Sequence, residues 1–559
     1  MKSTSFGALA STAIQSSYVT ALSPDFSPRL LSRQAAAPPA DSFVRRADAA
    51  ITVLGEYLYI VGGGVSVHVA DDKADAEARV AGLNVTLALS LKDDWQSRDA
   101  TYDVIEVPDH FGENIGHALW TNAKDKEVVF WGGRDFSNQV TGSRDPKVWT
   151  LAADGNGGGK WTSKEPPSDI RRAAFGGFTE CGVKGYFVGG YGGPYTDGPA
   201  FDGPRIAVPG LISYDFATGS FKNESTEGLT ESGAFQKGSA VCVELPGRKP
   251  KLFVVGGAEP KLTDVTDSDV SLQSFDNAYF YDLGTEKWYR QETQGSRPAS
   301  RQGTCVVGAS GSNGTYEIFM YGGFGEGGGP MDDAWVLSIP AFRWFKVDAK
   351  SDTRYSHACA RVGSQMIVFG GNDNPVWNKK DPFPKGLGVF SLNTLAWKDG
   401  FEANSAEYQG PSEVREWYEE RGLDTIPWGS DEIKQAFLST NNEDDDDSSE
   451  PAGPTATPSA AVSPNNTGAI AGGVVGGILA FALFGGIFWW WRRRRDTNKE
   501  PHERIVEADE SFAMKPYEMD SGFMPSELNS PATQRAAESR SGTKRAELDA
   551  QHHAVELPA

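Results

Sequence analysis

The chain has 559 residues, a formal net charge of −22 and four cysteines. So acidic a chain, with no basic face to offset the charge, argues against nucleic acid as a partner. Four cysteines are too few for a disulfide scaffold of this length, so stability must come from a packed core. Glycine (64 residues) and aromatic side chains (11%) are abundant, which suits many short strands joined by tight turns.

Residues 1–44 are rich in Ser, Ala and Pro and show no regular hydrophobic period. Lys2 and the apolar residues 6–10 follow the order of a secretory signal, a basic start and then an apolar core. Ser and Thr interrupt that core repeatedly. We therefore expect an N-terminal segment that carries at most a poor export signal.

Residues 45–402 repeat one pattern six times, and each copy contains a short apolar run that ends in two glycines. The pairs are Gly62-Gly63, Gly132-Gly133, Gly189-Gly190, Gly256-Gly257, Gly322-Gly323 and Gly370-Gly371. One strand-like segment precedes each run and two follow it, the last marked by an aromatic residue. These markers are Trp95, Trp161, Phe221, Trp288, Trp344 and Trp397. Four antiparallel strands repeated six times predict the blades of a β-propeller.

The order of apolar run, Gly-Gly, variable loop, strand and Trp resembles the kelch repeat. It is clearest in NAYFYDLGTEKWYRQ after Gly257 and in DDAWVLSIPAFRWFKV after Gly323. The resemblance implies an all-β fold, a six-bladed kelch-type β-propeller over residues 45–402. The whole arrangement is similar to fungal single-pass membrane kelch proteins, and this similarity does not supply a ligand.

Five arginines are predicted to lie on one face of the propeller. The long polar loops between second and third strands emerge on the face where the chain enters each first strand, beside Arg46, Arg134, Arg172, Arg301 and Arg354. A guanidinium donates two parallel hydrogen bonds, so this set suits carboxylate-bearing or polyhydroxyl ligands. The alternative is that each arginine braces neighbouring blades by bonding to buried carbonyls or aspartates.

Residues 403–440 are predicted to form a short helical extension after the propeller. Residues 412–422 have the pattern of a helix with Ser412 as N-cap and Gly422 as terminator, and Ser430 opens a second helix with acids in its first turn. Residues 441–467 are acidic and rich in Ser, Thr and Pro, the composition of a disordered stalk that can carry O-linked sugars.

Residues 468–491 form an uncharged run of 24 residues, long enough for a helix to cross a hydrocarbon core about 30 Å thick. Three tryptophans end the run and four arginines, residues 492–495, follow it. Because basic residues flank the cytoplasmic side of membrane spans, residues 492–559 are predicted to be a disordered cytosolic tail. We therefore expect a single-pass plasma-membrane protein with its propeller outside.

Four N-x-S/T sequons mark candidate glycosylation sites: Asn84, Asn223, Asn313 and Asn465. All four precede the predicted span and none lies in the tail. Their distribution therefore agrees with the orientation that the arginines indicate.

Gly468, Gly472 and Gly476 fall on one face of the predicted membrane helix. Small residues at this spacing allow two helices to approach closely, which favours a homodimer. The alternative is that glycine is simply common in membrane spans.

The four cysteines, Cys181, Cys242, Cys305 and Cys359, fall in the predicted first strands of the last four repeats, near the propeller axis. We expect buried thiols that act as small apolar groups, with a disulfide or a zinc site as alternatives. No CxxC spacing is present, so no metal is expected.

The sequence contains no nucleophile elbow, P-loop or metalloprotease motif, and we expect no catalytic residue and no cofactor. A galactose-oxidase-like extracellular oxidoreductase is the enzymatic alternative, since that family also uses a kelch-type propeller. Its copper site needs histidines, and the propeller offers His68, His110, His117 and His357. The expected function is therefore a binding or scaffold module for a protein or wall glycan on the long-loop face.

Overall fold

The computed structural model describes residues 43–68, 78–108, 110–136, 147–197, 203–266, 269–311, 314–373 and 377–439. The chain divides into two compact units, Met1–Ser448 and Ser449–Ala559, and every described residue belongs to the first. The expected stalk, membrane span and tail therefore lie outside the described residues. Within them, no helix has the length and apolar character needed to cross a bilayer.

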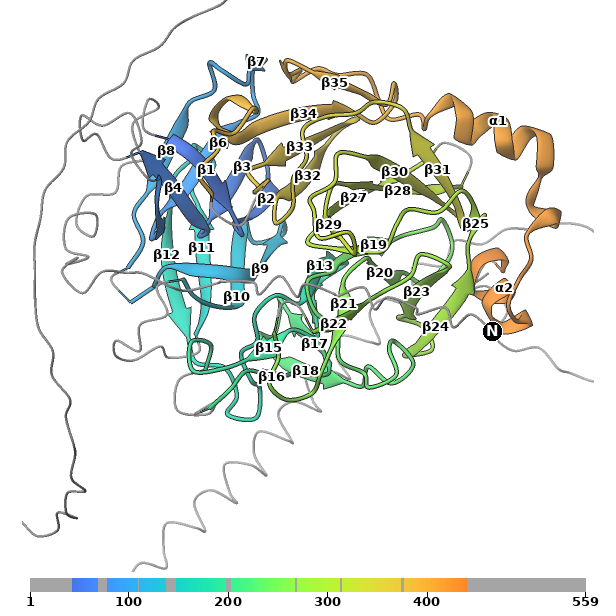
Figure 1. Ribbon diagram of the computed structural model, residues 1–559, viewed down its shortest axis with the longest axis horizontal. Helices are drawn as coiled ribbons and strands as arrows, with labels where there is room; N and C mark the ends of the chain where they lie inside the picture. Colours follow the sequence, from blue (N-terminus) through green and yellow to red (C-terminus); the bar gives the residue numbers. More distant parts are fainter. Residues whose placement is uncertain are drawn as a thin grey trace, which may run out of the picture. The chain divides into compact units, whose positions relative to one another are not determined.

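Six antiparallel meander sheets follow one another along the chain (Figure 1). The first sheet contains β2 (Ala50–Leu54), β3 (Tyr57–Val61), β6 (Thr86–Ser90) and β8 (Tyr102–Ile105). The second contains β9 (Asn114–Asn122), β10 (Glu127–Asp135), β11 (Val148–Ala153) and β12 (Gly159–Lys164). The third contains β13 (Gly177–Cys181), β14 (Lys184–Val188), β17 (Leu211–Asp215) and β18 (Phe221–Glu224). The fourth sheet contains β19 (Ser239–Val243), β20 (Lys251–Val255), β23 (Asn277–Asp282) and β24 (Lys287–Glu292). The fifth contains β27 (Cys305–Ser310), β28 (Tyr316–Tyr321), β30 (Ala334–Ile339) and β31 (Arg343–Val347), and β25 (Gln294–Gly295) pairs with β31 in parallel at its edge. The sixth contains β32 (Ala358–Val362), β33 (Gln365–Phe369), β34 (Leu387–Ser391) and β35 (Ala396–Lys398).

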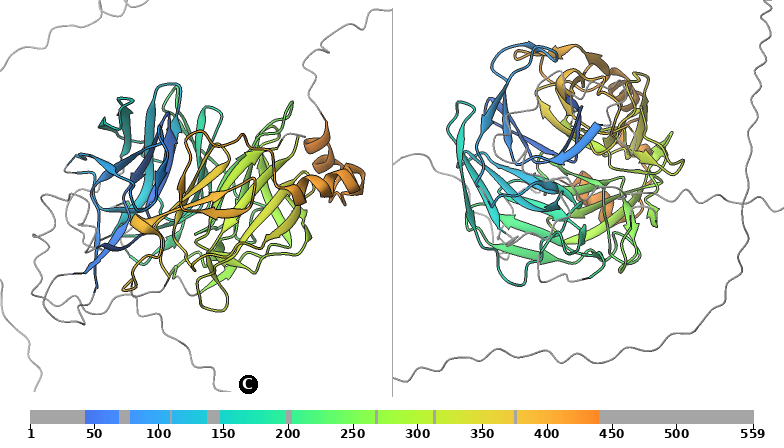
Figure 2. Two further views of the ribbon diagram at one scale, coloured as in Figure 1. Left: turned by 90° about the horizontal axis from the view of Figure 1, so that it is seen from above. Right: turned by 60° about the vertical axis from the view of Figure 1, so that its left-hand side comes forward.

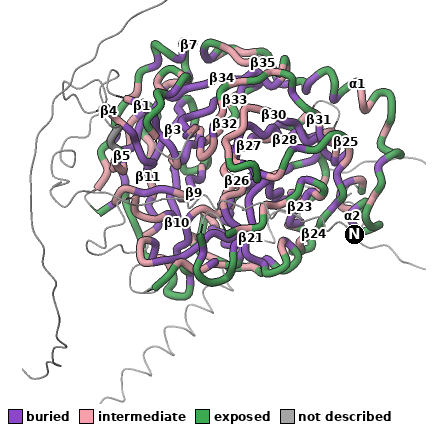
Figure 3. Tube along the Cα trace, in the orientation of Figure 1, coloured by how far each residue is buried: buried purple, intermediate pink, exposed green. Residues whose placement is uncertain are grey.

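The sheets stand around a common axis as a β-propeller (Figure 2). The first strand of each sheet neighbours the first strand of the next, and β32 of the sixth sheet again neighbours β2 of the first. Six clusters of the hydrophobic core each lie between two adjacent sheets, and a seventh, smaller cluster contains Tyr191, Ala207, Ala234 and Val265. Strands such as β3 and β20 are buried along their whole length because both faces of each sheet are covered (Figure 3).

The glycine pairs join each sheet to the next. The N–H of every second glycine donates to the carbonyl of the residue that opens the following sheet: Gly63 to Asn114, Gly133 to Ala173, Gly190 to Phe235, Gly257 to Arg301, Gly323 to Arg354 and Gly371 to Arg46, at 2.6–2.9 Å. Every first glycine has a positive φ, and a β-carbon there would crowd the same carbonyl. The pair is therefore required by the contact between sheets, and the bond from Gly371 to Arg46 closes the ring.

Several short strands lie outside the six sheets. They are β1 (Phe43–Ala47) with β4 (Gly64–His68) and β5 (Ala78–Gly82); β15 (Tyr191–Gly192) with β16 (Ile206–Ala207); β21 (Ala258–Pro260) with β22 (Val270–Leu272); β26 (Arg301–Gln302) with β29 (Phe324–Gly325); and β7 (Trp95–Gln96) with β36 (Gly400–Phe401). The 3-10 turn η3 (Pro384–Gly386) precedes β34.

One aromatic marker was assigned to the wrong strand. Trp95 lies in β7, whereas β8 is the fourth strand of the first sheet. The reason is ring closure: β7 pairs with β36 at the end of the propeller, and the Trp95 ring stacks on Phe401 with centroids 5.4 Å apart. The chain after Trp397 thus helps to seal the ring.

The predicted helices are present as α1 (Ser412–Arg421) and α2 (Asp431–Leu438), with the turn η4 (Leu423–Thr425) between them. Ser430 caps α2 as expected, since its side chain accepts a hydrogen bond from the Ile433 N–H. The N-cap predicted for the first helix was wrong, because Pro411 holds the extended cap position and Ser412 is already helical.

The helical extension packs along the outer edge of the propeller. The Phe437 ring of α2 packs against Phe253, Phe280 and Phe342 of the fourth and fifth sheets. The Tyr418 hydroxyl of α1 accepts from the Ala341 N–H at 3.0 Å. The extension therefore runs back from the sixth sheet toward the fourth.

The prediction of buried thiols was wrong, because the cysteines form two disulfides, Cys181–Cys242 and Cys305–Cys359. Each joins the first strands of adjacent sheets, third to fourth and fifth to sixth. The paired Cα atoms are 5.5 and 5.6 Å apart, the usual separation for a disulfide.

Candidate functional site

Each sheet is entered through three residues that repeat one backbone geometry. The carbonyl of the first accepts the glycine hydrogen bond, and the second pairs with the residue that follows the glycine pair, as in Ala174 with Tyr191 and Tyr355 with Asn372. The third is left-handed in every sheet, with φ between 51° and 65°. These third residues are Asp48, Gly116, Phe175, Lys237, Gly303 and Ser356. We call these six residues the entry ring.

Backbone hydrogen bonds connect the entry ring around the propeller axis. Asp48 donates to Ser356, Ser356 to Gly303, Gly303 to Lys237, Lys237 to Phe175 and Phe175 to Gly116, at 2.7–2.9 Å. A left-handed residue other than glycine costs about 1–2 kcal/mol, so four such residues need support from their surroundings. The bonds between sheets provide it. All six residues are half-buried, so the side chains of the four that are not glycine reach the surface.

Aromatic rings and cations gather beside the entry ring on the second, third and fourth sheets. The Phe175 ring stacks on Tyr191 at 5.7 Å and 16°. The Lys237 ammonium lies 5.4 Å from the Phe175 centroid, and the Arg134 guanidinium lies 6.0 Å from it. Arg205 lies 4.9 Å over Tyr191. We call these five residues the cation–aromatic cluster.

Four of the five predicted arginines are buried in the protein: Arg46, Arg172, Arg301 and Arg354. Each guanidinium donates to the carbonyl of a first glycine, namely Gly62, Gly132, Gly322 and Gly370 respectively. Their donors therefore satisfy the carbonyls of the tight turns after the second strands. This is the bracing geometry that the sequence left open as an alternative, and ligand contact by these four stays a prediction.

Acidic partners complete two of these braces. Arg301 Nη2 lies 3.1 Å from Asp333 Oδ2. Burial tends to raise the pKa of Asp333, but the pKa is lowered because the charge and hydrogen bonds of Arg301 act together with the hydrogen bond from Trp335. Arg354 Nη2 lies 3.3 Å from Asp381 Oδ1, and here burial raises the pKa of Asp381 despite the nearby arginines. Such buried pairs hold the fold, because removal of one member leaves an uncompensated charge.

Arg134 is the predicted arginine that reaches the surface. Its side chain is half-buried, donates to the Asp135 carbonyl at 3.1 Å and faces Phe175. It belongs to the cation–aromatic cluster. The sequence did not indicate Phe175 and Lys237, because the entry-ring positions share a backbone conformation and not a residue type. It did not indicate Tyr191 either, because only the fold brings this β15 residue against Phe175.

The histidines do not assemble a copper site among the described residues. His117 lies in β9 and His357 directly precedes β32, and burial lowers the pKa of each to about 3. His357 bonds through Nε2 to the Tyr321 carbonyl at 3.1 Å. The described side chains close enough to share a metal are Cys305, His357 and Cys359, and Cys181, Cys242 and Glu244. Their cysteines are disulfide-bonded, and a disulfide sulfur is no thiolate ligand.

Two predicted sequons fall on described residues. Asn223 is exposed in β18, and Asn84 is half-buried just before β6. Asn313, Asn465 and the glycines at 468, 472 and 476 lie outside the described residues. Glycosylation at these asparagines stays a prediction.

Comparison with known proteins finds kelch repeats. Residues 240–409, which include the fourth, fifth and sixth sheets, match the KLHDC2/KLHL20/DRC7 Kelch-repeats domain. A kelch repeat-containing protein of Arthroderma benhamiae is 25% identical over 395 residues, or 62% of this chain and 56% of the relative. The Rab9 effector protein with kelch motifs of Rattus norvegicus is 28% identical over 156 residues, or 27% of this chain and 36% of the relative. Host cell factor of Drosophila melanogaster is 28% identical over 124 residues, or 20% of this chain and 8% of the relative.

The chain thus spans little more than half the length of the fungal relative and less of the other two. None of the three carries a name that points to an oxidoreductase. The matched repeats coincide with the sheets whose glycine pairs and Trp residues show the repeat most clearly. With these matches and its ring of glycine-paired meander sheets, the chain is a kelch-repeat β-propeller protein.

Proposed function

We propose that the protein is a cell-surface binding and scaffold protein. It would carry a six-bladed propeller outside the plasma membrane, anchored by the single span at 468–491, with its C-terminus in the cytosol. Its ligand would be a protein held on the face of the entry ring. The observation that carries this proposal is the cation–aromatic cluster built on left-handed residues at that face.

The composition of the cluster supports a protein ligand. Aromatic residues and arginine are enriched in the energetically dominant parts of protein interfaces. The backbone at Phe175 and Lys237 is fixed by the bonds of the entry ring, so only the side chains remain to be ordered on binding. The rat relative is named a Rab9 effector, which agrees with a binding role for kelch repeats. A wall glycan is the other ligand class that the sequence suggested for this face.

The two disulfides support the placement outside the cell. Disulfides form and persist in oxidising compartments and are rare in the cytosol. Both lie in the propeller, on the same side of the predicted span as all four sequons. A homodimer through Gly468, Gly472 and Gly476 belongs to the same proposal and would add a second contact between copies.

The proposed site can be tested with substitutions that keep the backbone. Asn tolerates left-handed φ, so Lys237→Asn and Phe175→Asn remove the charge and the ring with little strain. Full-length protein would be cross-linked on intact cells with a reagent that does not enter them, then purified, and its attached proteins identified. We expect attached proteins that are lost from both variants.

Lys126→Asn is the matched control, because Lys126 is also left-handed (φ 58°) and exposed. It lies in the hairpin between β9 and β10, at the other end of the second sheet from the entry ring. It should retain the attached proteins. If Lys237→Asn and Phe175→Asn also retained all of them, the proposed site would be refuted.

A further inference from the structure

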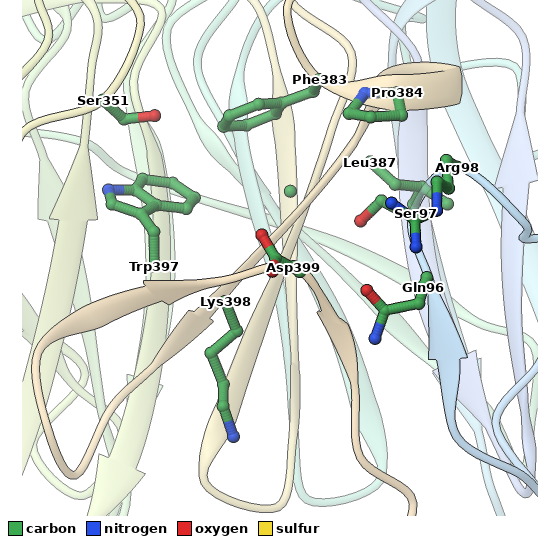
Figure 4. Close-up of a pocket in the computed structure, with 11 residues that line it drawn as sticks. Gln96, Ser97, Arg98, Ser351, Phe383, Pro384, Leu387, Trp397, Lys398 and Asp399 are labelled. Carbon is green, nitrogen blue, oxygen red and sulfur yellow. The ribbon is translucent and has the colours of Figure 1, made fainter.

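A pocket of about 290 Å³ opens where the sixth sheet meets the first (Figure 4). Trp397 of β35 and Phe383, which precedes η3, line one side, and Gln96, Ser97 and Arg98 of the segment around β7 line the other. It shares no residue with the entry ring or the cation–aromatic cluster. We call it the seam pocket.

The seam pocket has an apolar wall opposite a polar wall. The rings of Phe383 and Trp397 lie with their centroids 5.3 Å apart, and Figure 4 shows the indole turned toward the centre. The Gln96 amide offers both a donor and an acceptor across from them. The buried Trp397 Nε1 lies on the far side of the ring from the pocket centre, so the indole presents apolar atoms to the pocket. A ligand that fits must therefore be apolar on one face and rich in donors and acceptors at its edges.

The charges around the seam pocket come close to balancing. Lys398 pairs with Glu402 at 2.5 Å, and Arg98 pairs with Asp99 at 3.5 Å. The Asp399 carboxylate is exposed at the edge of the pocket and forms no bond with the described residues. Two cations disfavour a cationic ligand and the three carboxylates disfavour an anion, so the electrostatics select a neutral ligand.

We infer that the seam pocket binds one residue of a neutral carbohydrate. A pyranose ring presents C–H groups on a face and hydroxyls around its edge, which matches the two walls. The volume lies at the low end of small-molecule sites, so the pocket takes a single ring and no peptide segment. The inference goes beyond the proposed function, because it concerns a second site with a different class of ligand.

The binding can be measured by saturation-transfer NMR on the full-length protein in a detergent without a sugar headgroup. The probes are cellobiose, maltose and N,N′-diacetylchitobiose. We expect saturable binding of at least one, with the strongest transfer to the C–H protons of a single ring. The double variant Gln96→Ala/Asp399→Asn removes the exposed Gln96 amide and replaces the exposed Asp399 carboxylate by a weaker, neutral acceptor, and it should weaken binding about tenfold, as the loss of one hydrogen bond and the weakening of a second imply.

Gln409→Ala/Asp424→Asn is the matched control, because both residues are exposed and lie outside the seam pocket. It should bind like the wild type, and so should Phe175→Asn, which separates this site from the entry ring. Absence of saturable binding for all three sugars would overturn the inference. So would unchanged affinity in the seam-pocket variant, or binding of tetramethylammonium in place of any sugar.

Discussion

The seams between neighbouring sheets share the glycine hydrogen bond but differ in what else holds them. Between the third and fourth sheets and between the fifth and sixth, the inner strands are joined by disulfides, Cys181–Cys242 and Cys305–Cys359. At the closing seam between the sixth and first sheets, one buried ion pair connects the two sheets, and a second lies beside it within the sixth repeat. Arg45 Nη2 lies 3.0 Å from Asp373 Oδ2. Arg354 Nη2 lies 3.3 Å from Asp381, whose N–H donates to the Val44 carbonyl.

The difference reflects how far apart in sequence the joined parts lie. The disulfides connect residues 61 and 54 positions apart. The closing seam brings Arg46 to Gly371, near the two ends of the propeller, and so bears the largest loop-closure cost. It is held by several separate contacts, including β7 with β36. We expect single substitutions to open this seam while the two disulfide-linked pairs of sheets stay joined.

The largest effect is expected for Gly370→Ala at the closing seam. A β-carbon at Gly370 would overlap the Arg46 carbonyl, which the Gly371 N–H needs as its acceptor. The steric overlap and the strain of a left-handed alanine should together lower the free energy of unfolding by about 5 kcal/mol. Urea denaturation of the purified protein measures the change.

Gly182→Ala provides the control for backbone strain alone. Gly182 has a similar φ of 60° but no atom within 4 Å of its β-carbon position. It should cost only about 1–2 kcal/mol. Equal losses at the two glycines would mean that the seam contact contributes nothing beyond strain.

The next largest effect is expected for Arg354→Met, which leaves Asp381 buried without its partner. Breaking such a pair costs about 3–5 kcal/mol. Arg354→Met/Asp381→Asn should recover part of this loss, since no lone charge remains. Thermal unfolding of the three proteins gives the comparison. Full stability of Arg354→Met would show that the arginine is not a brace and would return it to the set of ligand-binding candidates.

Removal of one disulfide should have a smaller effect. Cys305→Ala/Cys359→Ala frees a loop in the unfolded chain and should lower the free energy of unfolding by about 2–4 kcal/mol. Peptide mapping without reductant should first recover Cys305 joined to Cys359 in the wild type. Recovery of both as free thiols would contradict the pairing and remove the contrast between the seams.

The sequence predicted the fold well because the fold depends on residues of fixed type. Only glycine fits where a β-carbon would meet a carbonyl, so Gly62 and Gly370 look alike in the sequence. The strand order followed from that period. The assignment of Trp95 failed because β7 pairs with β36, a contact between the two ends of the propeller that no local pattern records.

The candidate site was predicted less well, because its residues share a backbone conformation and spatial position but not an amino-acid type. The entry ring contains Asp48, Phe175, Lys237 and Ser356 at equivalent positions, which share only a left-handed backbone. The arginines were placed at the starts of the sheets, but the direction of a guanidinium depends on the carbonyls it meets. The disulfides depend on the register between sheets, which sequence spacing does not give.

The smallest expected effect concerns the seam between the first and second sheets, which also lacks a disulfide. Burial, reinforced by Asp135, raises the pKa of Glu113 to about 7 from 4.5. The folded protein therefore binds more protons than the unfolded chain between these pH values, and stability falls as the pH rises from 4.5 to 7. Because Glu113 is half-exposed to solvent, we expect a loss of about 1–2 kcal/mol.

Urea denaturation of the wild type and of Glu113→Gln at pH 5 and pH 7.5 measures this contribution. Glutamine keeps the shape of the side chain and does not titrate, so the variant should lose less stability between the two pH values. Other acids affect both proteins alike, and their contributions cancel in the difference. An identical pH dependence in the two proteins would show that folding does not change the pKa of Glu113. The closing seam would then be the one whose strength depends most on buried charge.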